Sequence, residues 1–179
     1  MDAKRAIVII DGSNLYHKLK SLEFRNLADF KYDRMVRDLI AESRLINKYF
    51  CIGKIQAKQN DNKARKMMAE QQKLLAKLKK SGFQIQLGYL LKSEGMYREK
   101  GTDVQIAVNL MKGAYRDDYD VAFLISSDSD LIPAINEVKE NGKEITYVGF
   151  MHQPSFALLK ACTHSRLLAK KDLNKYLPK

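Results

Sequence analysis

The chain has 179 residues, of which 45% are hydrophobic and 30% are charged. This size and composition fit a single globular domain and argue against global disorder or a second catalytic domain. Thirty-two Lys and Arg residues against 21 Asp and Glu give a formal charge of +11. That surplus favours polyanionic partners, nucleic acid first and anionic membrane second, although basic charge can also serve solubility alone.

The sequence contains only two cysteines, Cys51 and Cys162. Two are too few for a disulfide scaffold, and neither lies in a Cys/His cluster with zinc-binding spacing. The apolar run near the N-terminus spans about five residues, far short of a signal peptide or a membrane span. We therefore expect a cytoplasmic protein without a membrane segment.

The first half of the chain predicts two strands and one long helix. Residues 6–10 (AIVII) are a continuous β-branched run stopped by Asp-Gly, which is typical of a strand buried on both faces. Residues 48–55 predict a second strand. Residues 60–80 carry Met and Leu at helical spacing among Lys, Arg and Gln, which predicts an amphipathic helix that ends before Gly82.

The second half continues the alternation of strands and helices. Thr102 and Gln105 have the spacing of a capping box at the start of one helix, and Pro133 falls in the first turn of another. The elements expected in chain order are a strand over 83–91 paired with 96–99 as an antiparallel hairpin, a helix over 102–114, a strand over 121–126, a helix over 130–139 and a strand over 144–150.

Such alternation predicts an α/β fold, a three-layer α/β/α sandwich with a mostly parallel central sheet. We expect residues 1–150 to form the domain and residues 151–179 to form a basic helical extension packed on it.

Acidic side chains follow the predicted strands. Asp11 and Asn14 come directly after the first strand, and Asp128 and Asp130 come after the strand over 121–126, while Asp103 opens a helix. Because ligands bind outside the carboxyl ends of strands in open α/β sheets, these residues are expected to meet at one edge.

Each acidic residue taken alone also fits turn chemistry, a helix cap or a helix dipole. Several carboxylates in one cleft repel one another unless a cation neutralises them. Asp and Asn oxygens are hard ligands, so the set favours a Mg²⁺ or Mn²⁺ site.

Three segments carry a resemblance to a known family. IVIIDGSNLYH, KGTDVQIAVNLM and FLISSDSDLIPAI resemble, in order and spacing, the signature segments of the NYN domain, in the LabA-like branch of the PIN-like nuclease superfamily. The resemblance implies a PIN-like nuclease fold with an Asp metal site that cuts phosphodiester bonds, usually in RNA. The family's acidic residues match Asp11, Asp103, Asp128 and Asp130, and its D-x-x-N matches Asn14.

One position departs from the family pattern. Asn109 stands where many relatives have an Asp, which indicates a site that binds its cation more weakly.

These matches suggest metal-assisted hydrolysis. Asp11, Asp103 and Asp128 would hold one or two divalent ions, with Asp130 as a further carboxylate. Asn14 would orient a phosphate or a water. The residues expected to contact substrate phosphates at this site are Ser126, Ser127, Ser129 and Lys100.

A basic segment is the second candidate for substrate binding. Residues 54–80 hold nine basic and two acidic side chains, and among the basic ones we single out Lys63, Arg65 and Lys66. A solvated helix face is the plainer interpretation of such a charge run. The expected partner is RNA, single-stranded and preferred over DNA, cut endonucleolytically; a homodimer is left open.

Two rival functions stay open at this point. One is a non-catalytic RNA-binding or regulatory protein with a weakened metal site. The other is a phosphatase or glycosyltransferase that uses Asp128 and Asp130 as a D-x-D metal site, although a D-x-D after the first strand, as some phosphatases require, is replaced here by Asp11-Gly12-Ser13.

Overall fold

A single twisted sheet forms the centre of the molecule. The computed structural model describes residues 2–55, 61–93 and 96–178, and within these residues the sheet has seven strands in the order β4-β3-β2-β1-β5-β6-β7. All described neighbours pair in parallel except β3 and β4, which form an antiparallel hairpin. The strands are β1 (Arg5–Asp11), β2 (Arg44–Gly53), β3 (Gln84–Ser93), β4 (Met96–Lys100), β5 (Val121–Ile125), β6 (Glu144–Phe150) and β7 (His164–Leu168).

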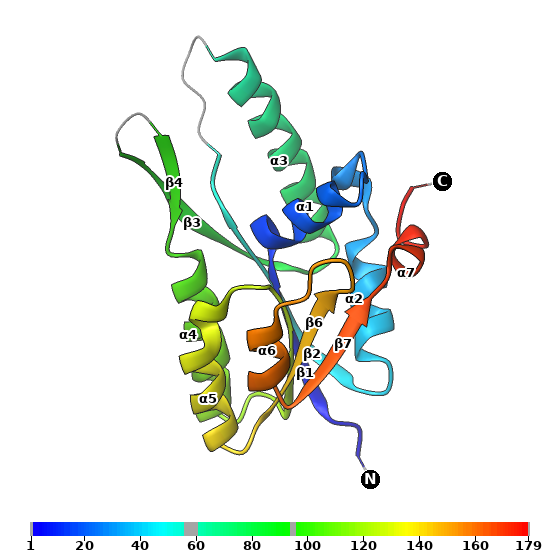
Figure 1. Cartoon of the computed structure of the whole chain (residues 1–179), viewed down its shortest axis with the longest axis vertical. Coiled ribbons are helices and arrows are strands. Elements are labelled where there is room, and N and C mark those ends of the chain that lie inside the picture. Colours follow the sequence, from blue (N-terminus) through cyan, green and yellow to red (C-terminus); the bar gives the residue numbers. More distant parts are fainter. Residues whose placement is uncertain (1, 56–60, 94–95, 179) are drawn as a thin grey trace.

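Helices cover both faces of this sheet, which confirms the predicted three-layer α/β/α sandwich (Figure 1). The first face carries α1 (Gly12–Ser21), the 3-10 turn η1 (Leu27–Asp29), α2 (Tyr32–Ile40), α3 (Asn62–Lys80) and α7 (Lys170–Asn174). The second face carries α4 (Thr102–Tyr115), the 3-10 turn η2 (Ser129–Leu131), α5 (Ile132–Glu140) and α6 (Phe156–Ala161).

Strand β1 shows why the sequence folds into layers. Ala6, Val8 and Ile10 are buried in the core beneath α1, α2 and α3, and the alternating Ile7 and Ile9 are buried in the core beneath α4 and α5. Successive side chains of a strand point to opposite faces, so a continuous apolar run supplies both cores. The predicted strand buried on both faces is confirmed.

Several local expectations are confirmed and one is wrong. Gly82 follows the end of α3 with a φ of 81°, the left-handed conformation that glycine adopts after helix ends. Pro133 lies in the first turn of α5. The capping box of Thr102 and Gln105 is not formed, because the N-cap of α4 is Gly101 with a φ of 86°, and the Gln105 backbone N–H donates to the Gly101 carbonyl instead.

The C-terminal segment contributes more than the expected helices. β7 pairs in parallel with β6 at the edge of the sheet, between α6 and α7. Leu173 on α7 and the following Tyr176 are buried in the first core. The expected basic helical extension over residues 151–179 did not include this strand, whose sequence HSRLL buries only Leu168 and so carries little apolar signal.

Helix α3 is fixed to the end of β2 by one side chain. The Gln71 amide donates to the Gly53 carbonyl (2.8 Å) and accepts from the Ile55 backbone N–H (2.9 Å). The first turns of α3 therefore lie beyond the carboxyl end of β2, on the same side as β3 and β4 (Figure 1).

Candidate functional site

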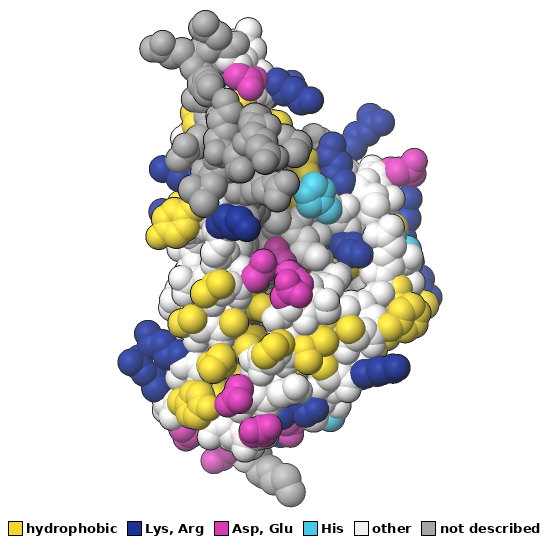
Figure 2. Space-filling view, turned by 60° about the vertical axis from the view of Figure 1, so that its left-hand side comes forward, with side chains coloured by type: hydrophobic (Ala, Val, Ile, Leu, Met, Phe, Trp, Pro, Cys, Tyr) yellow, Lys and Arg dark blue, Asp and Glu magenta, His cyan; other side chains and the backbone are white. Residues whose placement is uncertain are grey.

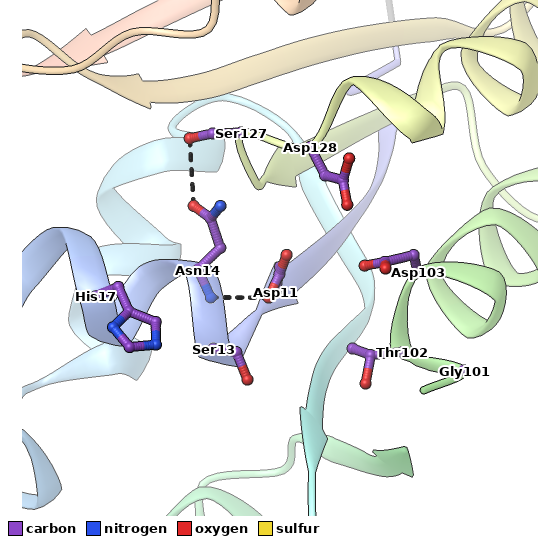
Figure 3. A pocket seen from close by; sticks show the side chains of 9 residues that line it. All are labelled: Asp11, Ser13, Asn14, His17, Gly101, Thr102, Asp103, Ser127 and Asp128. Atoms are coloured by element: carbon purple, nitrogen blue, oxygen red, sulfur yellow. Dashed lines mark hydrogen bonds between the residues drawn. The ribbon is translucent and has the colours of Figure 1, made fainter. Parts of the chain in front are cut away.

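A cavity of about 330 Å³ opens at the carboxyl ends of β1 and β5. β1 connects forward to β2 on one side of the sheet, whereas the chain returns to the other side of β1 at β5. This reversal is the topological switch point at which open α/β sheets bind ligands. The residues that line the cavity are Asp11, Ser13, Asn14, His17, Gly101, Thr102, Asp103, Ser127 and Asp128 (Figure 3).

Asp11 is the last residue of β1 and the N-cap of α1. One carboxylate oxygen accepts from the Asn14 backbone N–H and the other from the Ser126 hydroxyl, both at 2.9 Å. The Asp11 side chain is only 6% exposed. Hydrogen bonds from two donors and the helix N-terminus stabilise a charge that burial alone would disfavour. Burial, and secondarily the charge of Asp11, raises the pKa of the neighbouring Cys51 thiol to about 12.

The loop after β5 brings Asp128 to the opposite wall of the cavity. The Ser126 hydroxyl accepts from the Asp128 backbone N–H (3.2 Å), and one Asp128 carboxylate oxygen accepts from the Asp130 backbone N–H (2.9 Å) at the start of η2. The Ser127 hydroxyl donates to the Asn14 side-chain oxygen (3.3 Å). These hydrogen bonds join the β1–α1 segment to the β5–η2 segment, and so they fix the two walls of the cavity relative to each other.

The N-terminus of α4 supplies the third wall. Thr102 is buried against β3, where a Cβ added to Gly88 would come within 2.3 Å of the Thr102 hydroxyl oxygen. This close approach sets the start of α4 and places Asp103 in its first turn. Figure 3 shows the Asp11, Asp103 and Asp128 side chains facing a common space from three separate segments. In the space-filling view, acidic side chains gather at the centre of this surface (Figure 2).

The donor chemistry of this cavity suits a hard divalent cation, because its acidic ligands are carboxylates and Asn14 adds an amide oxygen. The geometry is more open than in a closed metal site. In the described part of the chain, no group of three His, Cys, Asp or Glu side chains is close enough to hold a metal ion.

The structure brings five of the predicted site residues to this cavity, namely Asp11, Asn14, Asp103, Ser127 and Asp128. The others lie outside its lining. Asp130 and Ser129 are exposed on η2, and Lys100 is exposed at the end of β4, next to Gly101. Lys63, Arg65 and Lys66 are exposed on the first two turns of α3.

Asn109 belongs to a cluster of amides instead. Its side chain exchanges two hydrogen bonds with Gln86 on β3 and accepts a third from Gln105. Gln86 also accepts from the Cys51 thiol at 3.3 Å. Because every partner here is neutral, an amide at position 109 satisfies the cluster without burying a charge.

Four lining residues were not singled out by the sequence interpretation: Ser13, His17, Gly101 and Thr102. His17 lies one turn after Asn14 on α1, and this spacing is the signal that would have found it, but the helix itself was not predicted.

Comparisons with known proteins agree with this arrangement. A family model described as the NYN domain matches residues 5–168, a range that includes β7. A crystal structure of a protein of unknown function from Vibrio parahaemolyticus is similar over 94% of both chains, with a TM-score of 0.69 and 19% sequence identity, which shows a shared fold. No curated protein matches the sequence. Among the described residues, none of the helices is long and apolar enough to cross a membrane.

Proposed function

Since this chain belongs to the NYN domain family, within the PIN-like nucleases, we propose that it is a metal-dependent ribonuclease. It would cut single-stranded RNA endonucleolytically, in preference to DNA, in the manner expected of the LabA-like branch. The observation that carries the proposal is that three carboxylates, from three separate segments, line one open cavity at the switch point.

The carboxylates have distinct roles in this proposal. Asp11, Asp103 and Asp128 would hold Mg²⁺ or Mn²⁺, and Asp130 would act from η2 as an outer carboxylate. When bound, the metal neutralises charge on the scissile phosphate and lowers the pKa of a water molecule. Asp11 is the fixed member of the set, because its position is set by β1, by α1 and by the Ser126 hydroxyl.

Neutral side chains would orient the substrate. The Asn14 side-chain oxygen accepts from the Ser127 hydroxyl, which orients the amide so that its nitrogen, a donor, would be available to a phosphate oxygen. Ser129 begins η2, directly after Asp128, and Lys100 precedes Gly101 in the sequence; both Asp128 and Gly101 line the cavity. From these positions Ser129 and Lys100 would contact the phosphates on either side of the scissile one. The exposed cations Lys63, Arg65 and Lys66 would attract the strand from farther away.

A cytoplasmic, reducing location is part of the proposal. Cys51 and Cys162 are both free and buried, which suits a compartment that keeps thiols reduced.

The test compares the parent chain with Asp11→Asn on labelled single-stranded and double-stranded RNA and DNA, each with Mg²⁺, Mn²⁺ or EDTA. A matched control is Asp61→Asn, since Asp61 caps α3 through the Ala64 backbone N–H but lies outside the cavity. We expect the parent and Asp61→Asn to cut single-stranded RNA only with metal, and Asp11→Asn to be inactive. EDTA-resistant cleavage that Asp11→Asn retains would overturn the metal site.

One alternative has its own support. The neutral amide cluster at Asn109, together with the open arrangement of the carboxylates, also suits a protein that binds RNA without cutting it. Undetectable cleavage by the parent under all metal conditions, with RNA binding retained, would favour this second function.

A further inference from the structure

A second cavity, of about 440 Å³, lies on the first face of the sheet between η1, α2 and the end of α3. Its volume is within the range of small-molecule sites. Phe30, Tyr32 and Leu78 form an apolar floor and are themselves buried. The charged side chains of the wall are five cations (Lys31, Arg34, Arg37, Lys77 and Lys80) and two carboxylates (Asp29 and Asp33).

Both carboxylates are already neutralised. Asp29 forms ion pairs with Lys77 and Lys73, and the hydrogen bond from Lys77 lowers the pKa of Asp29, which keeps it charged. Asp33 forms ion pairs with Arg37 and Lys48.

The other three cations of the wall, Lys31, Arg34 and Lys80, make no ion pair within residues 2–55, 61–93 and 96–178. The pKa of Asp38 is lowered mainly by its partners Lys175 and Tyr176, and Arg34 adds to this effect. Surplus charge of one sign around a concave surface focuses the potential and attracts counter-ions of the opposite sign.

The cavity continues into a row of lysines along α3, which we call the lysine stripe: Lys63, Lys66, Lys73, Lys77 and Lys80. At about 100° per residue, their spacing of three, seven, four and three residues keeps all five within an arc of about 100° of the helix surface, and all five are exposed. Arg65 and Lys79 fall outside this arc. At roughly 1.5 Å per residue the stripe is about 26 Å long.

The stripe runs nearly the whole length of α3. Its first lysines stand beyond the carboxyl end of β2, at the edge of the sheet where the carboxylate cavity opens, and its last two line the second cavity (Figure 1). Glu70 is the single acidic side chain of α3, and at helical spacing it lies within the arc of the stripe, between Lys66 and Lys73. A phosphate backbone is the ligand that matches a linear series of cations ending in a cationic cavity with an apolar floor.

We propose that the second cavity and the lysine stripe form an RNA-binding site remote from the carboxylate cavity. The cavity takes one nucleotide, with its base on the apolar floor and its phosphates on Lys31, Arg34 and Lys80, and the stripe tracks the adjoining strand. The choice of RNA as the polyanion rests on the proposed function.

The experiment measures binding of the full chain to a labelled long oligouridylate in EDTA, so that the strand is not cut. One variant is Lys31→Gln/Arg34→Gln/Lys80→Gln. The matched control is Lys112→Gln/Arg116→Gln/Lys160→Gln, which removes the same two Lys and one Arg from exposed positions at the ends of α4 and α6, on the opposite face. Both variants change the net charge equally, and neither removes an ion pair recorded for the described residues.

The salt dependence separates local contact from general charge. Each phosphate contact to a single strand contributes about 0.7 to the slope of log affinity against log salt, so loss of three contacts lowers the slope by about 2. Between about 50 and 200 mM salt the parent should then lose about 20-fold more affinity than the cavity variant. The control should keep the slope of the parent.

Three other results would decide between the inference and its alternatives. Equal slopes in the two triple variants overturn the inference, whether or not Asp11-dependent cleavage is seen. A slope change confined to the cavity variant, without cleavage by the parent, supports the inference and overturns only the proposed nuclease. Binding of ADP or pyrophosphate as tight as that of the oligouridylate, lost in the cavity variant, would identify a site for free nucleotides and overturn the strand assignment.

Discussion

Asp11 has two roles that substitution can separate. Its carboxylate caps α1 and bonds Ser126, and it also lines the candidate metal cavity. The first role needs a hydrogen-bond acceptor at this position, whereas the second needs a negative charge. Asp11→Asn keeps the acceptor and removes the charge, while Asp11→Ala removes both.

The hydrogen bonds of Asp11 determine how much each substitution should change the stability. Asn is as good an N-cap as Asp, and the Ser126 hydroxyl can rotate from donor to acceptor for the new amide, so we expect Asp11→Asn to change the free energy of unfolding by less than about 0.5 kcal/mol. Asp11→Ala leaves the Asn14 N–H and the Ser126 hydroxyl without this partner. That loss costs about 1–2 kcal/mol, which lowers the melting temperature by about 2–8 °C.

Asp11→Asn and Asp11→Ala should lose the same activity, although only Asp11→Ala loses stability. Loss of outer partners of metal ligands already costs about 10–100-fold, so loss of a direct carboxylate should lower RNA cleavage by at least about 100-fold in both variants. Thermal melting and cleavage of labelled RNA are measured on the same preparations. Asp61→Asn is the control, because Asp61 caps a helix but does not line the cavity. Full cleavage by Asp11→Asn would refute the catalytic role. Equal melting temperatures for Asp11→Asn and Asp11→Ala would refute the capping argument.

Three further predictions concern the metal, the packing of α4 and a buried thiol. Mn²⁺ at about 100 times its Kd should raise the free energy of unfolding of the parent by about 2.7 kcal/mol in thermal melts, and an equal rise in Asp11→Asn would place the ion elsewhere. Gly88→Ala should destabilise by about 1–3 kcal/mol in urea unfolding, because its Cβ would lie 2.3 Å from the Thr102 hydroxyl oxygen and 3.0 Å from the Lys100 carbonyl oxygen; unchanged stability would contradict that packing. The pKa of Cys51 is raised from 9.0 to about 12 by burial, so above about pH 9 the unfolded thiol ionises first and stability falls with rising pH. Cys51→Ala should lack that part of the slope, and an unaltered slope would show that Cys51 does not cause it.

The sequence predicts the sheet well because local pattern and tertiary environment agree there. The apolar runs over residues 6–10 and 121–126 become β1 and β5, which are buried on both faces. The long helix α3 is predicted from spacing and from Gly82, both of which act locally. No distant contact is needed to recognise these elements.

The helices α1 and α2 escape prediction for different reasons. Asp11-Gly12 reads as a turn, but Asp11 is an N-cap and α1 starts at Gly12 without an intervening loop. A Cβ on Gly12 would meet the Phe50 ring at 2.4 Å, so the glycine serves close packing against β2. α2 has Lys31 at its N-cap and no side-chain capping bond, which leaves only its apolar spacing as a signal.

Topology accounts for the part of the site that sequence reasoning placed correctly. Residues directly after β1 and β5 share the cavity, because neighbouring parallel strands end at one edge. Asp130 was expected beside Asp128, yet the Asp128 carboxylate accepts from the Asp130 backbone N–H and begins η2, which carries Asp130 outside the lining. A D-x-D sequence can therefore place both carboxylates in one site, or it can place only the first there and use it to cap the turn that carries the second away.

The distribution of basic charge is where the structure changes the interpretation most. Counted along the sequence, residues 54–80 form one block of nine cations. In space the helix divides that block: Lys73 and Lys77 form ion pairs with Asp29, and Arg65 and Lys79 lie outside the stripe. Three cations are left to bind a ligand at the end of the helix, and only Lys80 belongs to this block, whereas Lys31 and Arg34 come from a different segment. Polyanion binding by this protein therefore depends on which cations lack carboxylate partners, and a count of basic residues in one segment is a poor guide to where a strand would bind.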